Sequence, residues 1–250
     1  MKILGIIPAR FASSRFPGKP LVDIAGKSMI QRVYGQCKKS SSLSKVIVAT
    51  DDQRIFDHVR SFGGDVLITR QDHPSGTDRC EEVAKLFPEF EICMNIQGDE
   101  PLIDPLQIDL LSACFNQDHV GIATLVKKIT GKEELFNQNS PKVILNKDME
   151  AIYFSRAPIP FQRSFEQESW LHNHHYFKHI GIYAYRSSVL SEITKLPVSD
   201  LEKAEALEQL RWIENGFKIQ AAITDIESQA IDTPEDLNKL LSFLRSNPIN

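Results

Sequence analysis

Short runs of β-branched and other apolar residues alternate with amphipathic helical stretches through the first half of the chain, and this alternation limits the fold more than any other feature. The strand-like runs are Ile3–Ile7, Lys45–Thr50, Asp65–Thr69 and Ile92–Ile96. Such alternation is typical of a mostly parallel sheet covered by helices. Open α/β sheets bind their ligands at the carboxyl ends of their strands, and polar loops follow these runs. The sequence therefore predicts an α/β protein whose functional site is built from these loops.

The pattern changes after about residue 126. Shorter strand-like runs follow at Val143–Leu145, Ala151–Phe154 and Ile180–Tyr185. An irregular stretch from 158 to 175, rich in Pro, Gln and His, separates the last two of them. We therefore predict a small inserted antiparallel lobe at residues 127–186, within a larger α/β domain formed by residues 1–126 and 187–250.

Two helix starts are recognisable near the end of the chain. Ser199 and Glu202 have the spacing of a capping box, in which each side chain bonds the backbone N–H of the other residue. Thr233 is an N-cap candidate that is followed by Pro234, a residue favoured at the first helical position, and by the acidic Asp236. Both patterns predict helices that begin at these residues.

The composition narrows the class of protein. With 42% apolar and 25% charged residues, the 250-residue chain can bury an ordinary globular core. The formal net charge of −4 gives no overall positive field, so we expect no nucleic acid and no anionic membrane as partners. A signal-peptide pattern and a run of about 18 apolar residues are both absent, which predicts a cytoplasmic protein without membrane insertion.

The cysteines are Cys37, Cys80, Cys93 and Cys114. They are widely spaced and form no CxxC pair, so we interpret them as reduced core residues and not as a zinc site or a disulfide framework. The sequence His172-Asn173-His174-His175 looks like a metal-binding tract, but it lies in the least regular part of the chain. We interpret this tract as solvated.

A cationic loop follows the first strand, between Pro8 and Pro20. It carries Arg10, Arg15 and Lys19 together with the hydroxyls of Ser13 and Ser14. Backbone N–H groups combined with Arg and Lys are the usual way in which a protein holds the negative charge of a nucleoside triphosphate. On residue types alone, a solvated basic surface loop is the competing interpretation.

Two familiar nucleotide motifs are incomplete. Gly26-Lys27-Ser28 imitates the end of a P-loop, but Leu21 stands where its first glycine belongs, so we interpret Gly26 as a turn glycine. The GxGxxG fingerprint is absent after the first strand, which argues against a dinucleotide-dependent dehydrogenase.

Asp99 and Asp232 are the candidate ligands of a divalent cation. Asp99 lies just past a strand end in a Gly-Asp turn, and Asp232 directly precedes a helix start. Mg²⁺ binds one or two carboxylates together with phosphate oxygens and waters. From the sequence alone, an ordinary Asp turn explains Asp99 and favourable contact with the helix dipole explains Asp232 at least as well.

A longer set of motifs runs in order along nearly the whole chain. They are Ile7–Arg10, Ser14–Leu21, Val48–Asp52, Ser75–Arg79, Asn95–Pro101, Tyr153–Arg156, His179–Tyr183, Leu207–Arg211 and Asp232–Leu237. This ordered set resembles the 3-deoxy-manno-octulosonate cytidylyltransferase family. The resemblance implies a Rossmann-like nucleotidyltransferase fold of the nucleotide-diphospho-sugar transferase type, with a mixed sheet, helices on both faces and the inserted antiparallel lobe.

The resemblance also implies the reaction. The family transfers CMP from CTP to the anomeric hydroxyl of 3-deoxy-D-manno-octulosonate, an acidic eight-carbon sugar, and releases pyrophosphate. This step activates the sugar for lipopolysaccharide synthesis. The implied cofactor is Mg²⁺, residues 1–126 and 187–250 form the nucleotide-binding catalytic domain, and the 127–186 lobe contributes to the sugar site and to a homodimer.

The matching positions carry implied roles. Asp99 and Asp232 bind the metal, and these two residues act in catalysis with Arg10, Arg15 and Lys19. The nucleotide-binding residues are Pro8, Ala9, Arg10, Ser13, Ser14, Lys19, Ser75, Gly76 and Arg79. The sugar-binding residues are Gln97, Arg156, His179, Tyr183, Glu208 and Gln209.

Plainer interpretations of the sugar-binding candidates remain open. Arg156 is equally explained as a surface ion-pair partner, and His179 and Tyr183 as packed strand residues. Glu208 and Gln209 are expected in the middle of a helix, where solvated acids and amides are common. Similarly, the Ser75–Arg79 segment is otherwise explained as a polar turn.

Three alternative functions also remain open. A sister cytidylyltransferase would use sialic acid or the 8-amino octulosonate. Phe11, Phe16 and the poorly matching stretch 161–176 depart from the family pattern, and such differences can change the preferred sugar. A non-catalytic nucleotide-binding module is the second alternative. A glycosyltransferase, which has a similar sheet and an acidic metal-binding turn, is the third.

Overall fold

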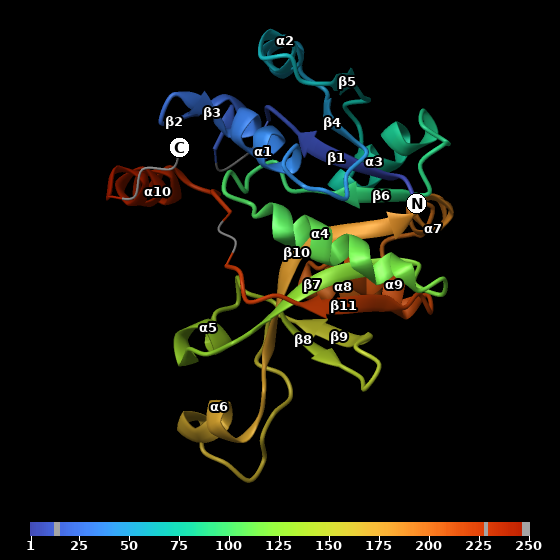
Figure 1. Ribbon diagram of the computed structural model, residues 1–250. Helices are drawn as coiled ribbons and strands as arrows, with labels where there is room; N and C mark the ends of the chain where they lie inside the picture. Colours follow the sequence, from blue (N-terminus) through green and yellow to red (C-terminus); the bar gives the residue numbers. More distant parts are fainter. Residues whose placement is uncertain (13–15, 228–229, 247–250) are drawn as a thin grey trace. The chain divides into compact units, whose positions relative to one another are not determined.

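The computed structural model describes residues 1–12, 16–227 and 230–246, and the chain forms two compact units (Figure 1). The first unit contains Met1–Asp109 and Ser228–Asn250, and the second contains Leu110–Glu227. Among the described residues, no helix has both the length and the apolar character needed to cross a bilayer.

The first unit is built on a parallel sheet with the strand order β6-β1-β4-β5. The strands are β1 (Ile3–Ala9), β4 (Lys45–Thr50), β5 (Val66–Ile68) and β6 (Ile92–Asn95). The helices are α1 (Met29–Cys37), α2 (Gln53–Ser61), α3 (Gly76–Lys85), α4 (Pro105–Ala113, which crosses the unit boundary) and α10 (Pro234–Ser246), with a 3-10 turn η1 (Lys19–Leu21). Strand β1 is almost entirely buried, as expected for a strand covered on both faces.

A two-stranded hairpin joins η1 to α1. Its strands are β2 (Asp23–Ile24) and β3 (Lys27–Ser28), and its turn residues Ala25 and Gly26 both have positive φ, at 50° and 82°. Two consecutive positive φ angles are typical of a tight hairpin turn, in which glycine is favoured. The interpretation of Gly26 as a turn glycine is therefore confirmed.

The C-terminal helix α10 packs back onto this hairpin. Leu240 and Leu244 on α10, and Ile231 just before it, form a buried cluster with Ile24 and Met29. Phe16 packs against the same cluster, so this departure from the family pattern has a packing role. Burial of these side chains attaches the segment that carries Asp232 to the first unit.

The second unit contains a mixed sheet with the order β11-β7-β10, in which β10 is antiparallel and β11 parallel to β7. The strands are β7 (Ile122–Lys128), β8 (Lys142–Leu145), β9 (Ala151–Ser155), β10 (Phe177–Arg186) and β11 (Ile219–Ile223). Strand β8 pairs antiparallel with both β9 and β10. The remaining elements are η2 (Cys114–Asn116), α5 (Lys132–Phe136), η3 (Gln167–Ser169), α6 (Trp170–Asn173), α7 (Ser187–Ile193), α8 (Asp200–Glu205) and α9 (Gln209–Glu214).

The predicted lobe at 127–186 lies within this second unit, which extends beyond it at both ends. Trp170 of the irregular stretch packs in a small core with Tyr176, Ile129 and Leu135. The assignment of 127–186 as a sugar-site and dimerisation lobe stays a prediction.

The predicted helix starts are confirmed. Ser199 and Glu202 form the reciprocal capping box at the start of α8. Thr233 Oγ1 accepts a hydrogen bond from the N–H of Asp236 at 3.2 Å, and the Asp236 carboxylate accepts one from the N–H of Thr233 at 3.1 Å. The cysteines are free and buried, as predicted.

Two local interpretations were wrong. The alternative interpretation of Ser75–Arg79 as a polar turn does not hold, because the Ser75 side chain accepts hydrogen bonds from the N–H groups of Thr77 and Asp78 and thereby starts helix α3. Glu208 and Gln209 are not in the middle of a helix, because Ala206 adopts a left-handed conformation (φ 50°) that ends α8 and a new helix begins at Gln209.

We predict that Arg211→Met lowers the free energy of unfolding by about 3 kcal/mol or more, because it leaves a buried carboxylate without its partner. Arg211 binds both carboxylate oxygens of Glu202 at 2.6 Å, and the two side chains are only 8% and 14% exposed. Urea unfolding followed by circular dichroism measures the change. Lys203→Met is the control, since its pair with Asp200 is 64% and 96% exposed and should matter by less than about 0.5 kcal/mol. Equal effects of the two substitutions would contradict the prediction.

Candidate functional site

One lysine contacts both candidate metal ligands. The Nζ atom of Lys19 lies 2.7 Å from Asp99 Oδ2 and 3.2 Å from Asp232 Oδ1. The three residues come from η1, from the turn after β6 and from the residue before the α10 cap, so distant parts of the sequence converge on one ammonium. Lys19 is 13% exposed, whereas the Asp99 and Asp232 side chains are 25% and 40% exposed. The carboxylates are therefore partly exposed to solvent, whereas the lysine is mostly covered.

Close backbone packing fixes the Asp99 turn. A Cβ atom on Gly98 would lie 2.7 Å from the carbonyl oxygen of Pro8, so this position accepts only glycine without a shift of the backbone. The N–H of Ile96 donates to the carbonyl of Ile6 at 2.9 Å, which extends the pairing with β1 up to the turn. The sequence Gln97-Gly98-Asp99 is thus held against the end of β1.

Asp232 is held by two further contacts. The N–H of Ile231 donates to the carbonyl of Asp99 at 2.9 Å, which joins the two aspartate-bearing segments directly. The N–H of Asp232 donates to the Asp236 carboxylate at 3.2 Å, so the N-terminal cap of α10 also fixes the Asp232 backbone. The helix cap and the core cluster therefore position this carboxylate.

The donor set fits Mg²⁺. Two carboxylates reach one cation, and Mg²⁺ binds one or two carboxylates together with waters and phosphate oxygens of a substrate. In the described parts of the chain, no group of three or more His, Cys, Asp or Glu side chains is arranged to hold a metal by itself. Two carboxylates are enough for Mg²⁺ when waters and phosphate oxygens supply its other ligands.

The candidate nucleotide residues gather where β1 ends and α3 begins. Pro8 and Ala9 are the last residues of β1, and a Cβ atom on Gly76 would lie 3.6 Å from Cγ of the Pro8 ring. Arg10 donates from its guanidinium to the carbonyl of His73, just before α3. Burial lowers the pKa of Arg10, and the neighbouring Arg79 charge lowers it further.

Arg79 has an internal role. Its side chain is fully buried, where it donates to Asp51 Oδ2 at 2.8 Å and to the hydroxyl of Thr69. The ion pair attaches helix α3 to the ends of β4 and β5. The sequence analysis assigned no role to Asp51 or Thr69, because a long-range contact with Arg79 leaves no pattern in the sequence.

The remaining loop residues Ser13, Ser14 and Arg15 lie outside the described residues. On either side of them, the N–H of Gly18 donates to the carbonyl of Phe11 at 3.0 Å and closes the loop. Arg54 stacks on the Phe11 ring at 3.3 Å from its centroid, so this second departure from the family pattern packs under a cation from α2. Sequence reasoning assigned no role to Arg54.

Three of the sugar-binding candidates lie together in the second unit. His179 Nε2 is 3.0 Å from the Thr124 hydroxyl, and its ring centroid is 5.1 Å from that of Tyr183. The β10–β7 register shifts between Ile180 and Tyr183, and such irregularities re-aim side chains near sites. Burial raises the pKa of Tyr183 well above its usual value, and the nearby Glu208 carboxylate raises it further.

The other two sugar-binding candidates in the second unit are Gln209 and Arg156, and they differ in whether their hydrogen-bond donors already have partners. Gln209 is buried, and in the described structure its Nε2 has no hydrogen-bond partner. The Arg156 guanidinium donates to the carbonyls of Glu205 at 2.7 Å, Gln138 at 2.9 Å and Ala206 at 3.2 Å. Arg156 therefore fixes the turn between α8 and α9. Gln97 belongs to the first unit.

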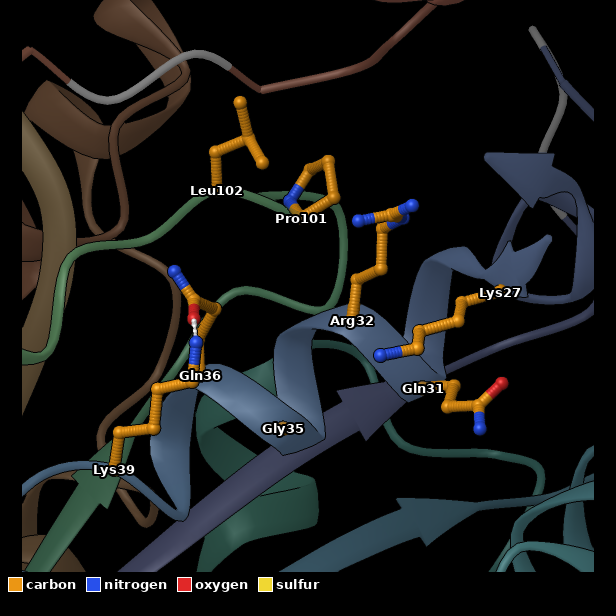
Figure 2. A pocket seen from close by; sticks show the side chains of 8 residues that line it. All are labelled: Lys27, Gln31, Arg32, Gly35, Gln36, Lys39, Pro101 and Leu102. Carbon is orange, nitrogen blue, oxygen red and sulfur yellow. Dashed lines mark hydrogen bonds between the residues drawn. The ribbon is translucent and has the colours of Figure 1, made fainter. Parts of the chain in front are cut away.

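A separate hollow of about 90 Å³ lies along α1 (Figure 2). Its lining residues are Lys27, Gln31, Arg32, Gly35, Gln36, Lys39, Pro101 and Leu102. The Lys39 ammonium donates to Gln36 Oε1 at 2.7 Å, and Arg32 Nε donates to the backbone carbonyl of Ile24 at 2.6 Å. None of the predicted site residues that the structure describes lines this hollow. Arg32 instead ties the β2–β3 hairpin to α1.

Comparisons with known proteins agree on one family. The family described as "Cytidylyltransferase" matches residues 4–219. The chain is 55% identical over 250 residues to a 3-deoxy-manno-octulosonate cytidylyltransferase of Bacteroides thetaiotaomicron, with 98% of this chain and 99% of that protein covered. A protein of the same description from Parabacteroides distasonis is 55% identical over 249 residues, with 98% of each chain covered.

Solved structures give the same result. The structure of CMP:2-keto-3-deoxy-manno-octonic acid synthetase complexed with CTP matches with a TM-score of 0.91 and 41% identity, over 98% of this chain and 99% of that chain. A 4-diphosphocytidyl-2C-methyl-D-erythritol synthase from Anaerococcus prevotii shares the fold alone, with a TM-score of 0.63 and 11% identity over 98% of this chain and 99% of that chain. The predicted mixed α/β nucleotidyltransferase fold is therefore confirmed.

The buried His179 leads to a testable pH dependence. Burial lowers the pKa of His179 from 6.5 to about 3. Between these two pH values the unfolded chain binds the proton and the folded chain does not. The free energy of unfolding contributed by the neutral His179 imidazole is therefore complete above pH 6.5 and is lost as the pH falls toward 3. Between pH 6 and 4 we expect the wild type to lose up to about 1.4 kcal/mol per pH unit more than His179→Gln in urea unfolding. Parallel pH profiles would contradict the buried, neutral state of this ring.

Proposed function

Because the chain belongs to the 3-deoxy-manno-octulosonate cytidylyltransferase family, we propose that it transfers CMP from CTP to the anomeric hydroxyl of 3-deoxy-D-manno-octulosonate and releases pyrophosphate. The product is the activated sugar used for lipopolysaccharide synthesis. One structural observation supports this proposal more than any other: Lys19, Asp99 and Asp232 converge, which combines a phosphate-binding cation with two metal-binding carboxylates.

In the proposed mechanism the chain aligns the reactants and neutralises charge, since transfer to phosphorus needs these more than covalent catalysis. Arg10, Arg15 and Lys19 would hold the triphosphate and the departing pyrophosphate. Asp99 and Asp232 would supply carboxylate oxygens to Mg²⁺. When bound, this ion would draw electron density from the phosphate oxygens and lower the pKa of the attacking hydroxyl.

The acceptor side is proposed to bind the sugar through hydrogen bonds. Gln209 has an unused buried amide donor that a sugar hydroxyl can satisfy. The low pKa of His179 makes its imidazole a hydrogen-bonding group and too weak a base to take the hydroxyl proton at neutral pH. Arg156 would act by holding the turn that precedes Glu208 and Gln209, and Gln97 and Tyr183 complete the proposed set.

A single assay tests the substrate assignment. The protein is mixed with CTP, Mg²⁺ and one sugar acid, and pyrophosphate release is measured for the octulosonate, its 8-amino variant and sialic acid. Release with the octulosonate is expected. Release with only one of the other sugars would assign the chain to a sister enzyme, and no release with any of them would favour a nucleotide-binding module or a glycosyltransferase.

The state of assembly and the location are also proposed from the family. We propose that the 127–186 segment contributes to a homodimer and that the enzyme acts in the cytoplasm. Light scattering coupled to gel filtration, on the wild type and on a variant lacking residues 161–176, tests the dimer. A wild-type mass near the 28.3 kDa of one chain would contradict it.

We predict that Asp99→Ala lowers kcat/KM at least ~100-fold, since residues of a metal shell contribute on this scale and Asp99 would be a direct ligand. Asp65→Ala is the matched control, because the Asp65 carboxylate is half-exposed and its ion pair in the described structure is with the surface residue Lys45, at 3.3 Å. Its activity should stay within about twofold of the wild type. Near-normal turnover of the Asp99 variant would exclude this residue as a metal ligand.

A further inference from the structure

Lys19 occupies the space that a metal bound by Asp99 and Asp232 requires. Mg²⁺ binds carboxylate oxygens at about 2.0–2.1 Å, so an ion held by both residues stands between their oxygens. The Lys19 ammonium lies there, at hydrogen-bond distance from Asp99 Oδ2 and from Asp232 Oδ1. An ammonium and a divalent cation also repel each other, and the low exposure of Lys19 (13%) limits screening by water.

The lysine is suited to a change of partner. Its backbone is fixed, because the N–H of Lys19 donates to the carbonyl of Phe16 at 3.2 Å and Pro20 beside it is buried. The side chain above this anchor is a flexible four-carbon stem that ends in a compact charge with three donors. It can therefore leave the carboxylates and reach another anion without movement of the main chain.

We propose that Lys19 is an internal counter-cation that blocks the metal site of the free enzyme, so that the divalent metal binds tightly only together with the nucleotide. The triphosphate offers Lys19 a new anionic partner, and its oxygens complete the ligand set of the metal. This inference rests on the proposed function, because it takes Asp99 and Asp232 as the metal ligands. By thermodynamic linkage, the metal must tighten nucleotide binding by the same factor by which the nucleotide tightens metal binding.

The test measures Mn²⁺ binding without turnover, by the electron paramagnetic resonance signal of free Mn²⁺. Lys19→Met keeps the length of the side chain and removes its charge. We expect it to bind Mn²⁺ at least ~10-fold more tightly than the wild type when no nucleotide is present, within the usual range of such couplings. With a non-hydrolysable CTP analogue, wild-type affinity should rise by at least the same factor, whereas that of the variant should rise less. Equal Mn²⁺ affinity of the two free proteins would overturn the proposal.

Controls separate this effect from a general loss of charge or of folding. Lys27→Met removes an exposed cation of the same unit and should leave the Mn²⁺ affinity unchanged. Lys19→Arg keeps the positive charge at the site and should bind Mn²⁺ as weakly as the wild type. In thermal unfolding, Mn²⁺ alone should raise the melting temperature of Lys19→Met more than that of the wild type. Equal shifts would count against the proposal even if the variant were less stable.

The proposal and the proposed function fail in different ways. If the wild type forms CMP-sugar but Lys19→Met binds Mn²⁺ no better, the counter-cation role is wrong and the enzymatic function stands. If Lys19→Met binds Mn²⁺ more tightly but the wild type releases no pyrophosphate with any sugar acid, the counter-cation role stands and the substrate assignment is wrong.

Discussion

The contact of one ammonium with two carboxylates depends on most of the architecture of the first unit. Lys19 reaches the site because η1 follows a loop closed between Phe11 and Gly18. Asp99 reaches it because Gly98 allows the turn after β6 to pack against the end of β1. Asp232 arrives last in the sequence, and it depends on apolar burial, since the cluster around Ile231 holds the start of α10 in place. The position of the charged residues in this unit therefore depends on its hydrophobic core, so a change in the core is expected to move the site as well.

The sequence predicted those elements whose signals are local. The strand at Lys45–Thr50 has the predicted bounds, and the helix starts at Ser199 and Thr233 were recognised because capping is decided by residues three apart. The wrong predictions arose where a short segment has two plausible structures. Ser75 could open a turn or a helix, and the buried pairing of Arg79 with Asp51 favours the helix. The end of α8 at Ala206 could not be recognised from a glycine, because an alanine occupies the left-handed position there.

Three of the charged residues that the sequence analysis selected lie together in the structure, whereas the hydrogen-bond partners of the candidate residues were not predicted. Asp99, Asp232 and Lys19 were identified because an ordered set of motifs gave them a context that residue type alone did not. Thr124 was missed, although its hydroxyl lies 3.0 Å from His179 and 2.8 Å from the carbonyl of Ile182. A threonine inside a strand is ordinary, and its role appears only when strands distant in the sequence are brought into register. Long-range hydrogen bonds of this kind leave no periodic signal.

The cations of the protein divide according to how their donors are used. Arg79 and Arg156 spread their planar guanidinium groups over several fixed acceptors, most of them more than ten residues away in the sequence, and such multiple bonding is costly to undo. Lys19 has a single nitrogen on a flexible stem, and its two partners are carboxylates that a metal also binds well. A structural cation is held by many hydrogen bonds, and a ligand cannot replace all of them at once. A cation that takes part in ligand binding has few hydrogen bonds, so a ligand can replace them. By this criterion Arg79 and Arg156 are structural cations, and Lys19 is the cation for which we propose an exchange of partners.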